Sequence, residues 1–296
     1  RNPYYWKIDP AGQQLPYLDQ VQYDVVESGE IANFKAIAGE IDMHSRYMSF
    51  ANYTVFQENS EKEDYEVYLW KNPVSDVVNL NLTHEDPAIR AMFMDKNFRL
   101  GLSYAINRQE IADIVYLGVG EPWQCLPVEE DPYYVAPKHL GYDVAQANKY
   151  LDDAGISARD SDGFRLRPDG EQFTMVVETY GAEEAGGASD EMELLREYWQ
   201  EVGIRTTITN IDRSLWTARR AAGEFMALAY LTAGIHWVVD PNWFVPTNSN
   251  NGWAPLAAQW NESQGAAGEE PAPELMQLID WYEQMKITTD EAARTQ

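Results

Sequence analysis

Apolar residues recur at helical spacing through residues 97–120. Four of them share one stripe of a helix: Phe98, Leu102, Ala105 and Ile106. Asn107 is suited to cap a second helix, and Glu110 three positions later would complete a capping-box-like pair. Gly118 is the expected end of that second helix. The pattern predicts two abutting helices with a capped junction and one buried face.

The first part of the chain reads as a small unit of short elements. Residues 21–27 alternate as a half-buried strand would, and residues 41–43 predict a second strand, after a short helix that stops at Gly39. Residues 68–82 look like a further strand, interrupted by Asn72-Pro73, because the residue before a proline has a restricted backbone. We therefore expect a small sheet-containing unit here, followed by a crossing into a second unit.

The rest of the chain predicts alternating helices and strands. The predicted helices span residues 143–155, 191–202 and 274–285. Their inward residues include Ala147, Leu151 and Ala154 in the first helix and Met192, Leu195 and Trp199 in the second. A hairpin with Pro168-Asp169-Gly170 at its turn leads into a core strand at 173–177, and another strand is predicted at 206–209. This alternation favours a parallel or mixed sheet covered by helices.

Composition and charge exclude several partners. The chain has 296 residues, 45% of them hydrophobic, which is enough for two domains with cores of their own. Its formal net charge of −26 would repel nucleic-acid phosphates and anionic lipid, so we expect no nucleic-acid partner. No apolar run approaches the ~18 residues of a membrane helix, so we expect no membrane insertion.

Few residues suit metal or covalent chemistry. Cys125 is the single cysteine and the four histidines are dispersed, which disfavours disulfides, redox pairs and zinc sites. No GxSxG, HExxH or phosphate-loop sequence occurs. Asp160 to Gly163 is like part of a calcium loop but lacks the remaining ligands, so a hydrogen-bonded turn is expected. We expect no enzyme activity, no metal and no cofactor.

Several stretches, in order along the chain, resemble one protein family. They are RNPYYW at 1–6, LPYLD at 15–19, GEID at 39–42, the paired helices at 97–120 and YDVAQANKYLDDAG at 142–155. This combination is similar to the extracytoplasmic solute-binding proteins of ABC transporters, in the group that contains peptide-, oligopeptide- and nickel-binding proteins (family 5). The resemblance covers nearly the whole chain and identifies a scaffold rather than a ligand.

The resemblance implies an α/β fold with the two-lobed type II architecture of periplasmic binding proteins, one lobe being incomplete. Residues 1–76 would form part of the first lobe and residues 77–296 the second, ligand-binding lobe, with a hinge near Asn72-Pro73. It also implies further chain at both ends and a signal peptide that this sequence does not contain. The protein would be a periplasmic or otherwise extracytoplasmic monomer that closes around a solute and delivers it to an ABC permease.

Residues 229–255 hold the strongest candidates for ligand contact, because aromatic and amide side chains alternate there with proline and glycine. The candidates in this block are Trp237, Asp240, Trp243 and Asn248. In peptide-binding relatives an aspartate of this region receives the α-ammonium of the peptide, and its position matches Trp237 here. Because a buried ammonium without a carboxylate is costly, the resemblance disfavours ordinary peptides.

Other candidates lie in three further segments. Arg220, next to Arg219, matches a place where relatives carry an arginine that pairs with a ligand carboxylate, with solvation at the surface as the alternative. The remaining candidates are Trp123 and Gln124, in the loop after the paired helices, and His44, Arg46 and Tyr47, after the predicted first-lobe strand. Both stretches would face the same cleft, and packing within the protein is the alternative for each.

Four kinds of function remain open from the sequence. An oligosaccharide or another neutral polar solute is favoured, because tryptophan faces and asparagine amides suit sugar rings and hydroxyls. An oligopeptide held through its backbone is the second possibility. A glycan-active hydrolase would need a second carboxylate across the cleft from Asp240. An interaction module without a small ligand is the fourth.

Overall fold

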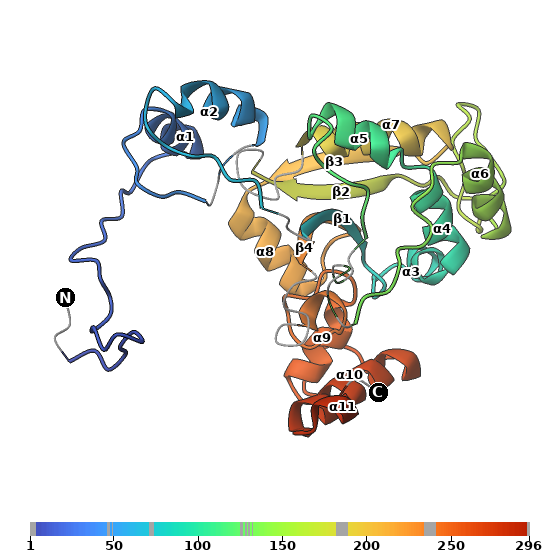
Figure 1. Ribbon diagram of the computed structural model, residues 1–296. Coiled ribbons are helices and arrows are strands. Elements are labelled where there is room, and N and C mark those ends of the chain that lie inside the picture. Colours follow the sequence, from blue (N-terminus) through green and yellow to red (C-terminus); the bar gives the residue numbers. More distant parts are fainter. Residues whose placement is uncertain are drawn as a thin grey trace.

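The computed structural model describes residues 4–294, apart from residues 46, 47, 49, 71–73, 125, 126, 128, 130, 132, 182–188 and 234–240. The helices that precede the sheet are α1 (Gly29–Ile37), the 3-10 helix η1 (Phe50–Asn52) and α2 (Tyr53–Ser60). They lie to one side of the sheet, joined to it by the segment that leads into the first strand (Figure 1).

A mixed sheet forms the centre of the remaining chain. Its strands are β1 (Val74–Leu80), β2 (Met175–Tyr180), β3 (Thr206–Ile211) and β4 (Ala227–Ala233), in the order β1-β4-β2-β3. β2 runs parallel to both β3 and β4, whereas β1 pairs with β4 in the antiparallel direction. In that pair Val74 lies opposite Ala233, so the chain enters β1 at the edge of the sheet where it leaves β4.

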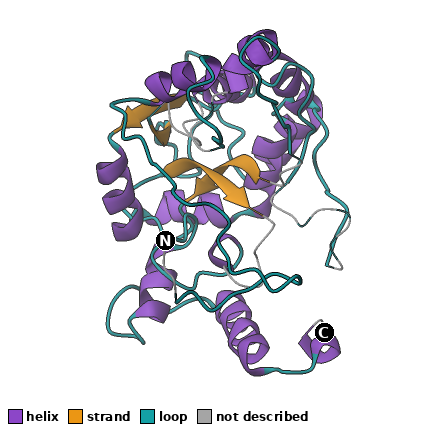
Figure 2. Ribbon diagram, turned by 60° about the vertical axis from the view of Figure 1, so that its left-hand side comes forward, coloured by secondary structure: helices purple, strands orange, loops and turns teal. Residues whose placement is uncertain are grey.

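Helices flank both sides of this sheet (Figures 1 and 2). The helices that lie between β1 and β4 along the sequence are α3 (Pro87–Met94), α4 (Lys96–Tyr104), α5 (Arg108–Ile114), α6 (Val144–Asp153), α7 (Ser189–Glu201) and α8 (Arg213–Ala222). After β4 come η2 (Pro241–Trp243), α9 (Pro255–Glu262), α10 (Pro273–Ile287) and α11 (Glu291–Arg294). The predicted mixed, helix-covered sheet is therefore confirmed.

Successive side chains of β4 enter two different cores, because residues of a strand alternate between the faces of its sheet. Ala227 and Ala229 belong to the larger core, which α3, α4, α6 and α7 cover. Leu228 and the half-buried Tyr230 point into a smaller cluster with Trp216 of α8. The smaller cluster therefore lies on the opposite face, and it lies near the carboxyl end of β2 because Tyr180, the last residue of β2, is one of its members.

The predicted helix caps at Asn107 and Asp143 are confirmed. The Asn107 side chain accepts a hydrogen bond from the Glu110 amide and donates one to the Glu110 carboxylate, which forms the capping-box-like pair that was expected. The Asp143 side chain accepts from the amide of Gln146 at the start of α6, and Gly155 follows that helix with a positive φ of 82°. Gly118 has φ 73° and donates back to the carbonyl of Ala112, which satisfies an otherwise orphaned carbonyl of α5.

The segment between α6 and β2 forms turns whose carboxylates are already used. Asp160 Oδ1 accepts hydrogen bonds from the amides of Asp162 and Phe164, and Arg205 pairs with Asp160 at 2.8 Å. This confirms the hydrogen-bonded turn. Within the described ranges no group of three or more histidine, cysteine, aspartate or glutamate residues could hold a metal ion. The core strand begins at Met175, two residues later than predicted, and Phe173 is nevertheless buried.

Two strands predicted in the first 70 residues are not formed. Residues 21–27 have no regular structure, and Val25 is 98% exposed rather than half-buried. Residues 41–43 also lack strand structure. A strand must exchange hydrogen bonds with a neighbour, and no sheet occurs among the described residues before residue 71. Alternation alone was therefore an insufficient signal, and the expectation of a small sheet in this unit was wrong for these residues.

The strand that was predicted where the chain enters the sheet is confirmed in part. The predicted strand at 68–82 shortens to β1, Val74–Leu80, and residues 72 and 73 lie outside the described residues. The charged turn after α2 is present at residues 61–64. Across the parts of the chain that the structure describes, no helix has the length and apolar character to cross a bilayer.

Candidate ligand-binding site

Aromatic rings and arginines from four elements meet near the carboxyl ends of β2 and β4. We call the group the aromatic–arginine cluster; its members are Tyr180, Arg213, Trp216, Arg220, Tyr230 and Trp243. α8 supplies three of them, because positions three or four residues apart lie on the same face of a helix. The carboxyl edge of the strands is where open α/β sheets bind ligands, so the location is typical of a binding site.

The rings of the cluster pack in a chain. Tyr180 and Trp216 have ring centroids 4.8 Å apart, and Trp216 and Tyr230 are 4.9 Å apart. Tyr230 then contacts Trp243 at 5.1 Å. Tyr180 and Trp216 are fully buried, whereas Tyr230 and Trp243 are half-buried. The inner rings therefore support the outer two, which keep a face toward the surface.

Arg220 is buried within this cluster without a carboxylate partner among the described residues. It is 7% exposed, and its guanidinium carbon lies 4.8 Å from the ring of Trp216 and 5.3 Å from that of Tyr230. Nη2 donates to Oδ1 of Asn250 at 2.9 Å, while Nε has no hydrogen-bond partner in this part of the structure. Burial lowers the pKa of Arg220, and Tyr230 opposes the shift, but a guanidinium stays charged at neutral pH.

Arg219, the neighbour of Arg220, has a different role. Its guanidinium forms three hydrogen bonds with the carboxylate of Glu178, at 2.6 to 3.2 Å. Glu178 belongs to β2 and is itself buried, so this ion pair fastens α8 to the sheet. The expectation that surface solvation could explain both arginines is therefore wrong for Arg220, which turns inward.

The asparagine-rich turn after η2 uses many of its amides internally. Asn248 Oδ1 accepts a hydrogen bond from the backbone amide of Asn250, the residue whose side chain binds Arg220. Asn251 is fully buried, donates to the carbonyl of Asn242 and accepts from the amides of Trp253 and Ala254. These amides shape the turn, so fewer of them are available to ligand hydroxyls than the sequence suggested.

Three further predicted residues that the structure describes, Trp123, Gln124 and His44, lie outside the cluster. Trp123 is half-buried and stacks with Tyr134 at 6.3 Å, and Gln124 exchanges hydrogen bonds with the backbone of Lys138. Both contacts close the loop after α5. His44 is half-buried, and its Nε2 has no hydrogen-bond partner among the described residues. The candidates Arg46, Tyr47, Trp237 and Asp240 lie outside the described residues.

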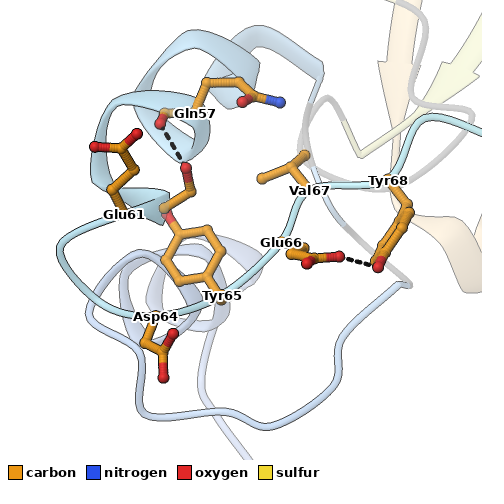
Figure 3. Close-up of a pocket in the computed structure, with 8 residues that line it drawn as sticks. Gln57, Glu61, Asp64, Tyr65, Glu66, Val67 and Tyr68 are labelled. Atoms are coloured by element: carbon orange, nitrogen blue, oxygen red, sulfur yellow. Dashed lines mark hydrogen bonds between the residues drawn. The ribbon is translucent and has the colours of Figure 1, made fainter.

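A separate hollow of about 550 Å³ lies beside α2 (Figure 3). Its lining consists of Gln57, Ser60, Glu61, Asp64, Tyr65, Glu66, Val67 and Tyr68. The Tyr68 hydroxyl donates to the carboxylate of Glu66, and Tyr65 donates to the carbonyl of Phe56. Since its lining shares no residue with the candidates predicted from sequence, we do not assign the ligand to this hollow.

Four members of the cluster were missed from the sequence: Tyr180, Arg213, Trp216 and Tyr230. A usable signal existed for Trp216, which stands four positions before Arg220 and so shares its helix face. Tyr180 lies three residues beyond the strand predicted at 173–177, and its contact with α8 depends on the packing of the sheet. The described members offer guanidinium and indole donors and aromatic faces, but no carboxylate, which suits ligand oxygens better than an ammonium group.

The sequence profile described as "Bacterial extracellular solute-binding proteins, family 5 Middle" matches residues 1–255. The periplasmic alpha-galactoside-binding protein of Rhizobium meliloti (strain 1021) is 23% identical over 316 residues. That alignment covers 100% of this chain and 44% of the relative. The chain therefore spans less than half the length of this curated relative.

Solved structures of binding proteins share the fold. An oligopeptide-binding protein, OppA, superposes with a TM-score of 0.71 at 32% identity, over 100% of this chain and 50% of its own. The periplasmic binding protein MelB from Agrobacterium fabrum C58, solved with stachyose, gives a TM-score of 0.74 at 19% identity. Its match covers 100% of this chain and 45% of MelB. The second likeness concerns the fold alone.

Proposed function

Because this chain belongs to family 5 of the bacterial extracellular solute-binding proteins, we propose that it is the ligand-binding part of the substrate-binding component of an ABC importer. It captures a solute outside the cytoplasm and delivers it to the permease, without covalent chemistry. The family match over residues 1–255 carries this proposal. The aromatic–arginine cluster, placed at the carboxyl edge of the sheet, supports it as the place of capture.

In this proposal the ligand is held between two lobes, with residues 1–76 belonging to the first and residues 77–296 to the second. The register of β1 on β4 supports the arrangement, because Val74 lies opposite Ala233 and the chain thus crosses between units beside the cluster. Closing about that crossing would bring the first unit over the ligand. Four residues remain proposed ligand contacts: Arg46 and Tyr47 in the first lobe, and Trp237 and Asp240 in the second.

A neutral oligosaccharide is the ligand class that we favour. Tyr230 and Trp243 are half-buried aromatic residues, which suit contact with sugar rings, and Nε of Arg220 and Nε1 of Trp216 have no hydrogen-bond partner among the described residues. Asn248 accepts a hydrogen bond from the backbone amide of Asn250, whose side-chain oxygen accepts one from Arg220. The names of an alpha-galactoside-binding relative and of a stachyose complex point in the same direction.

An oligopeptide is the second candidate, because one observation favours it. Arg220 carries a buried positive charge, and its polar partners among the described side chains, Asn250 and Tyr230, are neutral. A carboxylate at the end of a peptide would compensate that charge. The 32% identity with an oligopeptide-binding protein also supports this candidate.

A thermal-shift series separates the two ligand classes. We expect stachyose at 100 times its dissociation constant to stabilise the protein by about 2.7 kcal/mol, and a tetrapeptide to have little effect. If the tetrapeptide stabilises the protein and its C-terminally amidated form does not, the peptide assignment replaces the sugar assignment. No stabilisation by either class, across a broad panel of sugars and peptides, would count against the cluster as the binding site.

Replacing Trp243 with alanine is expected to weaken sugar binding by about 1–3 kcal/mol, which is about 5- to 150-fold, because a large apolar face is lost from the site. Calorimetric titration with stachyose measures the change. Trp281→Ala is the matched control, because Trp281 lies on α10 and is 59% exposed. Equal losses in the two variants, or an unchanged affinity in Trp243→Ala, would contradict the assignment.

A further inference from the structure

The hydroxyl oxygen of Tyr116 contacts two carboxylate oxygens from distant parts of the sequence. It lies 2.6 Å from Oε1 of Glu191 and 2.9 Å from Oδ2 of Asp76, and together they form a three-oxygen cluster. Asp76 is the third residue of β1, Tyr116 follows α5, and Glu191 is in the first turn of α7. The three residues therefore connect a strand and two helices that lie close together in Figure 1.

The hydrogen bonds around this hydroxyl need more protons than the side chains supply when both carboxylates are ionised. A phenol carries one proton and donates it to one acceptor. The other carboxylate then faces a lone pair of the phenol oxygen, so two oxygen atoms meet at hydrogen-bonding distance without a proton between them. A second proton removes the conflict, because a protonated carboxyl group donates to the phenol oxygen.

The surroundings favour that second proton. Burial raises the pKa of Glu191, and the Tyr116 hydrogen bond opposes the shift, whereas the charges of Asp76 and Asp190 add to it. Loss of solvent also raises the pKa of Asp76, although this residue keeps an exposed edge. Among the described residues, no cation contributes to either shift.

The ring of Tyr116 also packs against an aromatic pair. The Phe50 ring lies 5.9 Å from that of Tyr116 and stacks with Tyr53 at 5.4 Å. Both belong to the helices that precede the sheet, η1 and α2. The three-oxygen cluster thus lies where these helices touch the rest of the protein and where β1 begins.

We propose that Asp76, Tyr116 and Glu191 form a proton-operated latch, in which Glu191 takes up a proton, donates to Tyr116, and Tyr116 donates to Asp76. The protonated latch fastens β1 and α7 to the turn after α5. It also fixes the ring on which Phe50 rests, so the contact with the N-terminal helices becomes firmer as the pH falls. The half-buried Glu191 holds the proton because the more exposed Asp76 is better solvated as an anion.

The sign of the pH dependence follows from proton linkage. Glu191 has a folded-state pKa above its ordinary value, so the folded protein binds more protons than the unfolded chain in the interval between the two pKa values. The latch therefore stabilises fully below the ordinary glutamate pKa, and this contribution disappears as the pH rises through the raised one. At neutral pH the open latch leaves two close carboxylates unneutralised.

Melting temperatures at about pH 7.5 and about pH 5.5 test the latch with Glu191→Gln, whose amide donates at every pH. We expect this variant to melt ~2–4 °C above the natural protein at the higher pH and to gain less on acidification. Glu197→Gln is the control, because Glu197 is exposed on the same helix and its substitution removes the same charge. A Glu191→Gln variant that behaves like the control at both pH values would overturn the proposal.

A second measurement stays informative if a variant folds poorly. In a carbon-13 NMR titration of the natural protein, we expect one glutamate carboxyl to titrate at higher pH than the exposed carboxyls, and to return to their range in Tyr116→Phe. If every carboxyl titrates within one common range, the latch does not exist. If calcium chloride stabilises the natural protein and Glu191→Gln abolishes this effect, a bound metal ion rather than a proton joins the two carboxylates. That result would also overturn the proposal.

Discussion

Replacing Arg165 with methionine is expected to lower the free energy of unfolding by about 3–5 kcal/mol. The side chain is 3% exposed and donates to the carbonyls of Val202 and Ile156, each at 2.8 Å. It also donates to Oδ1 of Asn148 at 2.8 Å and pairs with Asp152 at 2.6 Å. Methionine keeps an apolar stem but removes every donor of this side chain, so the carbonyl of Ile156 loses its hydrogen bond, whereas Arg159 still donates to the carbonyl of Val202 and to Oδ1 of Asn148.

Chemical denaturation of the Arg165→Met variant measures this loss. Arg196→Met is the control, because Arg196 forms an exposed pair with Glu193 on α7 and such pairs contribute about 0–1 kcal/mol. The effect of Arg165 should reach both α6 and α7, since its partners come from the ends of these two helices. A loss below 1 kcal/mol would show that water or a rearranged backbone satisfies the acceptors.

Leu151→Ala is the second large change, with an expected cost of about 2–5 kcal/mol. Leu151 is fully buried on α6 and packs against α4 at Gly101. A Cβ atom at Gly101 would lie only 2.6 Å from Cγ of Leu151 and 3.1 Å from the carbonyl oxygen of Ala147. The two helices therefore approach closely because a glycine on one faces a leucine on the other.

This packing makes the effect of Gly101→Ala depend on its background. Alone, the added methyl group collides with Leu151 and should destabilise the protein by about 1–3 kcal/mol. In the Leu151→Ala background the same methyl group enters the new cavity, and alanine also favours the helix, so the double variant should be more stable than Leu151→Ala. Leu215→Ala, at a 52% exposed position, should cost little. Additive losses in the double variant would refute the clash.

Local signals in the sequence were sufficient for the helices. Asn107 and Glu110 cap α5 through bonds between residues three positions apart, so the pattern is complete without tertiary contacts. The inward stripe of α7 was also predicted, because Leu195 and Trp199 share one face and both are buried. Such features depend only on residues within one or two helical turns of each other, so they can be predicted from a single sequence.

Strands and the candidate site depend on partners that are distant in sequence. Residues 21–27 alternate as a strand does, yet the described structure provides no neighbour that would accept their hydrogen bonds. In the site, Arg220 and Trp243 were predicted, and Tyr230 joins them only because β4 places its side chain on the α8 face of the sheet. Alternation and residue type indicate candidates, whereas the order of the strands decides which of them meet.

Arg219 and Arg220 have consequences for how ligand specificity changes during evolution. The ion pair with Glu178 holds α8 on the sheet, and the next residue, Arg220, faces the aromatic rings and donates to the neutral side chain of Asn250. In the proposed site, mutations at position 220 or 250 would change the charge and the hydrogen bonds offered to a ligand while the anchoring pair stays intact. On that proposal, ligand specificity changes through few substitutions, without compensating changes in the scaffold.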